Sequence, residues 1–157
     1  MALRNIIQDG DAILLKKSRK VTVFDPRLHQ LLDDMAETMA AANGAGLAGV
    51  QVGVLRRVCL VDAGDGLVEL VNPKIISWSE ESQTGAEGCL SFPGKYGLVT
   101  RPMQVTVQAQ TRHGDLFEIT GEGLKARAFC HEIDHLDGKV FLELVTEMLE
   151  DDVDDEA

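Results

Sequence analysis

The sequence predicts one α+β domain, in which two helices accompany several strands. The chain has 157 residues, which suits a single domain because domains commonly hold about 100 to 200 residues. Apolar residues recur at helical spacing near 26–43 and 123–136, and short β-rich runs lie between these segments. Apolar residues make up 45% of the chain and charged residues 26%, so the domain can bury a core.

The first helix is predicted to begin after Asp25, an N-cap residue that is followed by proline at the first helical position. It should end near Asn43-Gly44, where a glycine follows the last periodic residue. The apolar positions recur at spacings of three and four residues, which places them on one face of a helix: Leu28, Leu31, Leu32, Met35 and Met39.

The strands are predicted from β-rich runs at 58–61, 68–72 and 74–78, which glycines and Pro73 separate. Residues 105–110 alternate between apolar and polar, and a turn leads from them into 116–120, so we expect a β-hairpin. The second helix should run from about Gly123 to Leu136, with Gly138 as its C-terminal cap.

Charge is unevenly distributed along the chain. Asp and Glu total 26 against 15 Lys and Arg, and a net charge of -11 argues against DNA binding, which depends on neutralising phosphates. No basic residue follows Lys139, whereas seven acidic residues lie within 147–156. The sequence therefore predicts a domain over residues 1–146 and an acidic tail over 147–157, mobile beyond 150.

Targeting signals and the use of cysteine both favour a cytoplasmic protein. The chain has no apolar run of about 18 residues and no apolar stretch of the signal-peptide type near Met1, so no membrane partner is expected. In the cytoplasm, thiols are kept reduced, so Cys59, Cys89 and Cys130 should be free thiols, metal ligands or a nucleophile rather than disulfide partners.

The strongest chemical motif is His131-Glu132-Ile133-Asp134-His135, an H-E-x-x-H in the second predicted helix. Residues four apart share a helix face, so His131 and His135 can bind one metal ion. Glu132 then lies beside the open coordination position, where a general base is needed.

A third metal ligand is not settled by the spacing. Phe141 stands where one class of zinc proteases has its third histidine. The remaining candidates are distributed over the chain: Glu143, Glu147, His29, His113 or a thiolate. Among the thiolates, Cys89 has the most suggestive setting, since it lies between Gly88, which permits close backbone approach, and Pro93. Cys59 fits a buried strand and is expected to be unreactive.

A third feature is the segment from Gly44 to Gln51, which contains a G-x-G-x-x-G pattern. It follows a helix and leads toward strands, so it lacks the context of a dinucleotide fingerprint. One interpretation is a glycine cap with a turn. The other is that Gly44 and Gly46 leave a wall bare for a ligand backbone, while Gln51 supplies an amide donor.

These three segments together resemble the peptide deformylases. That family carries G-x-G-L-A-x-x-Q, E-G-C-L-S and H-E-x-D-H segments in this order, and here they stand at 44–51, 87–91 and 131–135. The resemblance covers about residues 1–146 and implies an α+β fold in which antiparallel sheets surround a central helix that bears the histidines. Three residues depart from the usual pattern: Gly49, Cys130 and Arg127, the last near the expected substrate side-chain pocket.

The resemblance implies a metal-dependent hydrolase that removes the N-formyl group from the N-terminal methionine of nascent polypeptides and releases formate. By carry-over, Cys89, His131 and His135 bind the metal, and a bound water has its pKa lowered from about 15.7 toward 7. Glu132 accepts the proton of that water. The Gln51 side chain and the Leu90 N–H stabilise the oxyanion, and such donors are each worth about 3 to 4 kcal/mol.

Substrate-binding residues and cofactors follow from the same resemblance. The expected substrate-binding residues are Gly44, Ala45, Gly46 and Gly88. Glu87 and Arg101 should pair and brace the cysteine segment. The family's ion is generally Fe²⁺, which Zn²⁺, Ni²⁺ or Co²⁺ can replace. Nascent formyl-Met peptides are the expected partner, with transient ribosome association as a further one.

Two alternative functions can be compared with this interpretation. A metallopeptidase that cuts internal peptide bonds would share the H-E-x-x-H geometry, but Phe141 and a thiolate ligand are unusual for it. A non-enzymatic binding module on the same fold would be expected to lack Glu132 or Gln51, and both are present. The hydrolase is therefore favoured.

Overall fold

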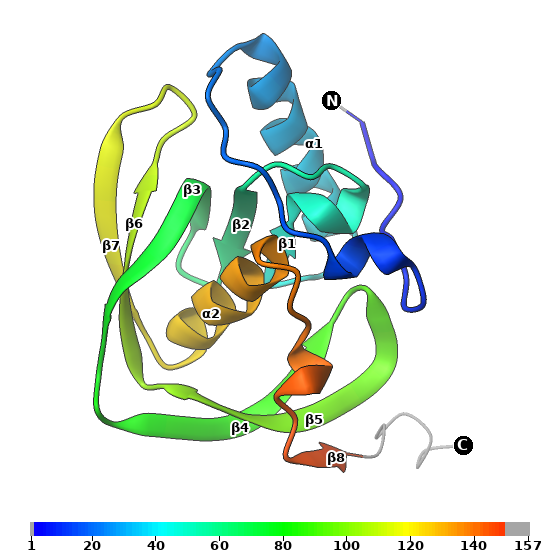
Figure 1. Cartoon of the computed structure of the whole chain (residues 1–157), viewed down its shortest axis with the longest axis vertical. Coiled ribbons are helices and arrows are strands. Elements are labelled where there is room, and N and C mark those ends of the chain that lie inside the picture. The colour runs from blue at the N-terminus through cyan, green and yellow to red at the C-terminus, as the bar shows by residue number, and fades with distance from the viewer. Residues whose placement is uncertain (1, 150–157) are drawn as a thin grey trace.

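The protein consists of two antiparallel sheets and two main helices, as seen in a computed structural model described over residues 2–149 (Figure 1). The larger sheet has the order β1-β2-β3-β6-β7 and the smaller one the order β4-β5-β8. The larger sheet contains β1 (Gly46–Ala48), β2 (Val58–Asp62), β3 (Leu67–Trp78), β6 (Gln104–Gln110) and β7 (Leu116–Glu122). The smaller sheet contains β4 (Ser82–Cys89), β5 (Phe92–Pro102) and β8 (Glu147–Leu149).

The helix α2 (Leu124–Leu136) lies between the sheets, with strands of both packed around it (Figure 1). The second long helix is α1 (Pro26–Ala41). Three short 3₁₀ helices complete the chain: η1 (Ala12–Leu15), η2 (Gly49–Val52) and η3 (Phe141–Glu143). The predicted α+β class, with sheets around the helix that bears the H-E-x-x-H motif, is confirmed.

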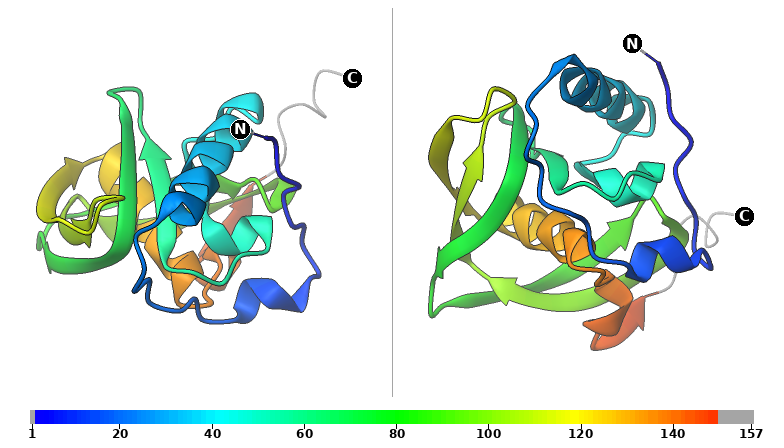
Figure 2. Two further views of the ribbon diagram at one scale, coloured as in Figure 1. Left: turned by 90° about the horizontal axis from the view of Figure 1, so that it is seen from above. Right: turned by 45° about the horizontal axis from the view of Figure 1, so that its top comes forward.

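Strand β2 is buried on both of its faces, which explains its uninterrupted apolar sequence. Val58 and Leu60 pack in the core cluster that contains α1. Cys59 and Val61 point to the opposite face and pack in the cluster that contains α2. The right-hand view of Figure 2 shows the two helices on opposite sides of β1 and β2. Strand β2 thus separates the core cluster that contains α1 from the core cluster that contains α2.

The predicted start of α1 is confirmed. The Asp25 carboxylate accepts a hydrogen bond of 3.1 Å from the Leu28 N–H, and Pro26 occupies the first turn. The helix ends at Ala41, and Asn43 has a positive φ of 55°. The chain then turns sharply toward β1, which brings Gly46 of the glycine-rich segment against the Glu132 side chain of α2.

One sequence prediction was wrong in detail, because 68–72 and 74–78 form one strand instead of two. Strand β3 runs through Pro73, and its register with β6 shifts between Val71 and Lys74. Proline has no N–H to donate, so it is accommodated at this irregularity. Asn72 adopts φ 52° and its side chain bonds to both the N–H and the C=O of Val21, which fastens the N-terminal segment to the sheet.

The hairpin β6–β7 and the helix α2 agree with their predictions, and Gly138 follows α2 with a φ of 77°. Strands β4 and β5 have no counterpart in the sequence analysis.

Residues 147–149 of the predicted acidic tail pair with β5 as strand β8. The mobility predicted beyond residue 150 lies outside the described residues. Within residues 2–149, no helix is long and apolar enough to cross a membrane.

Phe129 anchors α2 in its core and provides a test of this packing. Its side chain is fully buried, and a Cβ at Gly121 would come within 2.8 Å of its ring, so glycine leaves room for it. We expect Phe129→Ala to lower the free energy of unfolding by about 3–5 kcal/mol, because a cavity remains. Leu116 is 71% exposed, and Leu116→Ala should change stability by only about 0.5 kcal/mol. Urea denaturation measures both, and equal effects would contradict this packing.

Candidate active site

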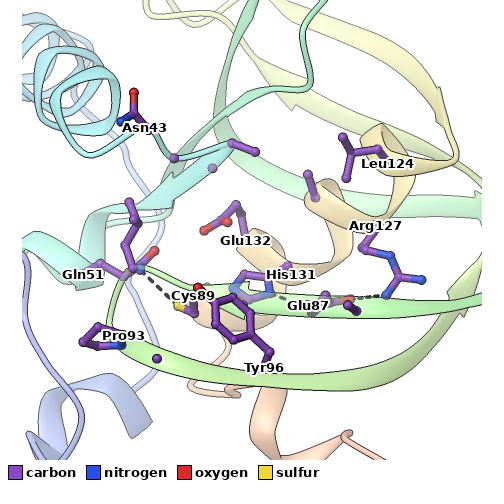
Figure 3. A pocket seen from close by; sticks show the side chains of 18 residues that line it. Asn43, Gln51, Glu87, Cys89, Pro93, Tyr96, Leu124, Arg127, His131 and Glu132 are labelled. Carbon is purple, nitrogen blue, oxygen red and sulfur yellow. Dashed lines mark hydrogen bonds and ion pairs between the residues drawn. The ribbon is translucent and has the colours of Figure 1, made fainter. Parts of the chain in front are cut away.

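The three predicted motifs meet at a cavity of about 440 Å³. The turn at 43–46, the hairpin of β4 and β5, and the first nine residues of α2 supply its walls (Figure 3). Gly44, Ala45, Gly46 and Gly88, the expected substrate-binding residues, all line it, as does Leu90. Segments from three separate parts of the chain therefore build one chemical environment.

Three possible metal ligands converge at the floor of this cavity. The ligand atoms of Cys89, His131 and His135 lie within 4.8 Å of one another. Cys89 stands at the end of β4, and its Sγ lies 3.3 Å from the Nε2 of His135. The two imidazoles come from adjacent turns of α2, with ring centroids 5.0 Å apart. One thiolate and two imidazoles form a donor set suited to a borderline transition-metal ion.

The other proposed third ligands lie elsewhere in the fold. His29 bonds to the carbonyl of Arg112, and its ring packs against that of His113. Glu143 accepts a hydrogen bond from the Val140 N–H. Cys59 and Cys130 belong to the apolar core around α2, and all three cysteines are free. Among residues 2–149, Cys89 is the only additional ligand near the two histidines.

Glu87 orients the first histidine. Its carboxylate accepts a hydrogen bond of 2.9 Å from His131 Nδ1, which leaves Nε2 of the ring to face Cys89 and the cavity. Arg101 donates to both carboxylate oxygens at 2.9 Å, so the predicted pair is confirmed. Burial opposes ionisation, but the hydrogen bonds from Arg101 and His131 lower the pKa of Glu87 to about 2.

Two hydrogen bonds hold the positive charge of Arg127 in place beside the expected substrate pocket. Its Nη1 donates to Glu87 at 2.7 Å and to the Val99 carbonyl at 2.9 Å. The guanidinium lies along the β4–β5 wall, where a Cβ at Gly85 would approach Nη2 to 3.2 Å. Glu87 thus neutralises the Arg127 charge within the wall. The sequence analysis missed this contact and that between Asp134 and Arg101, since both link distant segments.

Glu132 is the buried carboxylate nearest the open side of the ligand group. Only 4% of the residue is exposed, and its Oε1 has no hydrogen-bond partner in the described part of the chain. Burial raises the pKa of Glu132 to about 7, against the opposing charge of His131. A carboxylate with such a pKa can take up and release a proton near neutral pH.

Gln51 is held with its amide nitrogen toward the ligands. Its Oε1 accepts a hydrogen bond of 2.9 Å from the Ala48 N–H. Because an N–H needs an acceptor, this contact assigns the oxygen and the nitrogen of the side-chain amide. Nε2 then contacts Cys89 Sγ at 3.4 Å (Figure 3). It also donates to Ser91 Oγ at 3.1 Å. The sequence analysis missed Ser91, a fully buried hydroxyl whose only signal was its place in the E-G-C-L-S segment.

Comparison with known proteins places the chain in a family. The family model described as polypeptide deformylase matches residues 3–150. The chain belongs to the polypeptide deformylase family. Deformylases are metal-dependent hydrolases that remove the N-formyl group from the N-terminal methionine of nascent polypeptides, and this chain has that function.

Relatives and solved structures agree over nearly the whole length of the deformylase domain. The peptide deformylase of Acetivibrio thermocellus is 55% identical over 152 residues, covering 97% of this chain and 89% of that protein. The Thermotoga maritima peptide deformylase structure has a TM-score of 0.90 at 37% identity, covering 92% of this chain and 98% of that one. An Ehrlichia chaffeensis deformylase in complex with actinonin has a TM-score of 0.90 at 37% identity, over 93% and 90% of the chains.

Gly46 provides a test of how tightly the site is built. A Cβ at this position would collide with the Glu132 carboxylate. We expect Gly46→Ala to lower kcat for formate release by roughly 100-fold, because a displaced base no longer reaches its proton. Metal content, measured by atomic absorption, should remain stoichiometric.

Gly44→Ala is the comparison variant for this measurement. Its Cβ would come within 2.7 Å of Leu90 Cδ1, the end of a flexible side chain that can move aside. The loss of kcat should therefore stay below about tenfold. Equal losses in the two variants would show that Gly46 does not act through Glu132.

Proposed function

We propose that this deformylase acts through Cys89, His131 and His135 as metal ligands and Glu132 as general base. The observation that carries the proposal is the convergence of these three ligand atoms beside the buried Glu132 carboxylate, whose Oε1 has no hydrogen-bond partner within residues 2–149. We propose residues 1–146 as the catalytic domain. When bound, a divalent ion supplies Lewis-acid polarisation and lowers the pKa of a water toward 7.

Three protein groups carry out the remaining steps of the proposed reaction: Glu132, Gln51 and the Leu90 N–H. Glu132 takes the proton of the attacking water and later delivers it to the departing amine. Gln51 Nε2 and the Leu90 N–H donate hydrogen bonds to the oxyanion that develops on the formyl oxygen. The bond from Ala48 to Gln51 supports this role, since it preorganises the amide donor.

The walls of the cavity fix how a substrate can enter. Gly44, Ala45, Gly46 and Gly88 have little or no side chain, so we propose that the substrate backbone passes along them. A Cβ at Gly88 would press on the Tyr96 ring at 2.7 Å, which supports a requirement for glycine there. Leu124, Ala128 and the Arg127 stem offer apolar surface for the methionine side chain.

We propose Fe²⁺ as the physiological metal, with Zn²⁺, Ni²⁺ and Co²⁺ as functional substitutes. A ligand set of one thiolate and two imidazoles accepts each of these ions. The thiolate makes Cys89 the residue most vulnerable to oxidation. We further propose that the protein works in the cytoplasm and associates transiently with the ribosome, where its nascent substrates emerge.

The ligand assignment can be tested through the three cysteines. We expect Cys89→Ala to lose most of its bound metal and its formate release, because two imidazoles alone leave the ion weakly held. Cys59→Ala and Cys130→Ala serve as matched controls, since both thiols lie in the apolar core, and they should retain one metal per chain. Full metal occupancy in Cys89→Ala would remove this residue from the ligand set.

The base assignment is tested with Glu132→Gln. The amide cannot accept a proton, whereas both imidazoles and the thiolate remain, so metal content should be unchanged. Formate release from a formyl-Met peptide at saturating substrate should fall by about 100 to 10,000-fold. Turnover close to that of the wild type would assign proton transfer to another group.

A further inference from the structure

The side-chain amide of Gln51 already has a partner for each of its polar hydrogens. A glutamine amide carries one carbonyl oxygen and two N–H donors. Its Oε1 accepts the N–H of Ala48 at 2.9 Å. Its Nε2 donates to Cys89 Sγ at 3.4 Å and to Ser91 Oγ at 3.1 Å. One of these two N–H groups must therefore leave its acceptor before Gln51 can bind an oxyanion.

The position of the two acceptors decides which N–H can be released. Gln51 and Cys89 both line the active-site cavity, and Cys89 Sγ belongs to the group of converging ligand atoms. Ser91 is fully buried and is not one of the described residues that line the cavity. A substrate in the cavity can thus approach the N–H that contacts Cys89, whereas the N–H on Ser91 is out of its reach.

Two anchors hold the amide more firmly than one. The last torsion of a glutamine side chain has broad preferences, so an amide that is bound only through its oxygen can still turn. The bond from Nε2 to Ser91 Oγ supplies a second fixed point at the other end of the group. With Oε1 held by Ala48 and one N–H held by Ser91, the remaining N–H has a single direction, toward Cys89.

The N-terminal segment fixes the backbone of both partners. The Ile7 N–H donates to the Gln51 carbonyl at 2.7 Å, and the Asp9 N–H donates to the Ser91 carbonyl at 2.7 Å. Asp9 is also paired with Lys95 of β5 at 2.5 Å. A single stretch of chain thus joins η2, which bears Gln51, to the turn between β4 and β5, which bears Ser91. The contact between the two side chains therefore rests on a backbone that is held from outside the cavity.

We propose that Ser91 is a positioning residue for the hydrolysis. Its hydroxyl retains one N–H of Gln51, while the other N–H passes from Cys89 Sγ to the oxyanion that forms on the formyl oxygen. This inference rests on the proposed role of Gln51. The exchange needs no rotation of the amide, so the donor is preorganised for the charge that develops. Leu90, the second proposed donor, directly precedes Ser91, so one turn carries both a donor and the anchor of the other donor.

The first test compares two buried serines in the metal-loaded, full-length chain. We expect Ser91→Ala to lower kcat for formate release from a formyl-Met peptide by about tenfold, because the amide donor is no longer held in place. The KM should stay within about twofold of the wild type, and one metal per chain should remain. Ser18→Ala is the matched control, since this buried hydroxyl has no hydrogen-bond partner within residues 2–149. It should change kcat by less than about twofold.

Ser91→Thr is the conservative variant, because it keeps the hydroxyl that accepts the Gln51 N–H. It should recover most of the kcat that Ser91→Ala loses. Thermal midpoints of all variants identify any that fail to fold. Equal kcat in Ser91→Ala and the wild type, with both folded, would overturn the positioning role.

A double-mutant cycle separates positioning from a structural role. Gln51→Ala should lower kcat by about 100 to 1000-fold, as expected for the loss of an oxyanion donor. Adding Ser91→Ala to this variant should cause no further loss, because the amide that Ser91 holds is gone. The same loss from Ser91→Ala with and without Gln51 would overturn the proposal. A Gln51→Ala variant with the kcat of the wild type would instead contradict the proposed function of Gln51 itself.

The Co²⁺-loaded chain supplies a readout that does not depend on turnover. Hydrogen bonds to a ligating sulfur tune the electronic properties of its metal, so the thiolate absorption band should report the N–H on Cys89. We expect Gln51→Ala to shift this band, Ser91→Ala to shift it in the same direction, and Ser18→Ala to leave it unchanged. A band that neither Gln51→Ala nor Ser91→Ala alters would overturn the exchange at Cys89.

Discussion

The site depends on the buried carboxylate of Glu87, which joins three elements of the fold. It receives hydrogen bonds from His131 on α2, from Arg101 on β5 and from Arg127 on α2, while it stands itself on β4. A buried ion pair of this kind adds little net stability, because desolvation offsets the attraction. Its contribution is geometric: unless β4, β5 and α2 are in register, a charge is left unpaired in the core. The carboxylate therefore ties correct folding to correct ligand orientation.

The second constraint is the position of α2 between two sheets. A helix surrounded on all sides must bury its polar residues, so every such residue needs a partner. His131 and Asp134 meet this need through Glu87 and Arg101. Three buried atoms of α2 have no partner among residues 2–149: Arg127 Nη2, Glu132 Oε1 and His135 Nδ1. Of these, the Glu132 oxygen belongs to the carboxylate that we propose as the base, and a base needs an oxygen that is free to accept a proton.

Local patterns predicted much of the site, and long-range contacts account for what they missed. The spacing of His131 and His135 on one helix and the capping of α1 by Asp25 are local properties, so both could be read from the residues. Cys89 was only one of several candidate ligands until the resemblance singled it out. Arg127 was noticed as unusual, but its partner lies 40 positions away on β4. Strands β4 and β5 escaped prediction because their glycine-rich and polar residues show no clear alternation.

The short strand β8 has a consequence for how the protein behaves in solution. It pairs with β5 at Tyr96, Gly97 and Leu98, and so covers backbone groups along the edge of the smaller sheet. Uncovered edges of this kind recruit strands from other molecules. The Glu147–Leu149 segment, which begins with a carboxylate, therefore covers this part of the β5 edge and opposes edge-to-edge aggregation. The Glu147–Leu149 segment thereby lowers the tendency of this part of β5 to pair with a strand of another molecule.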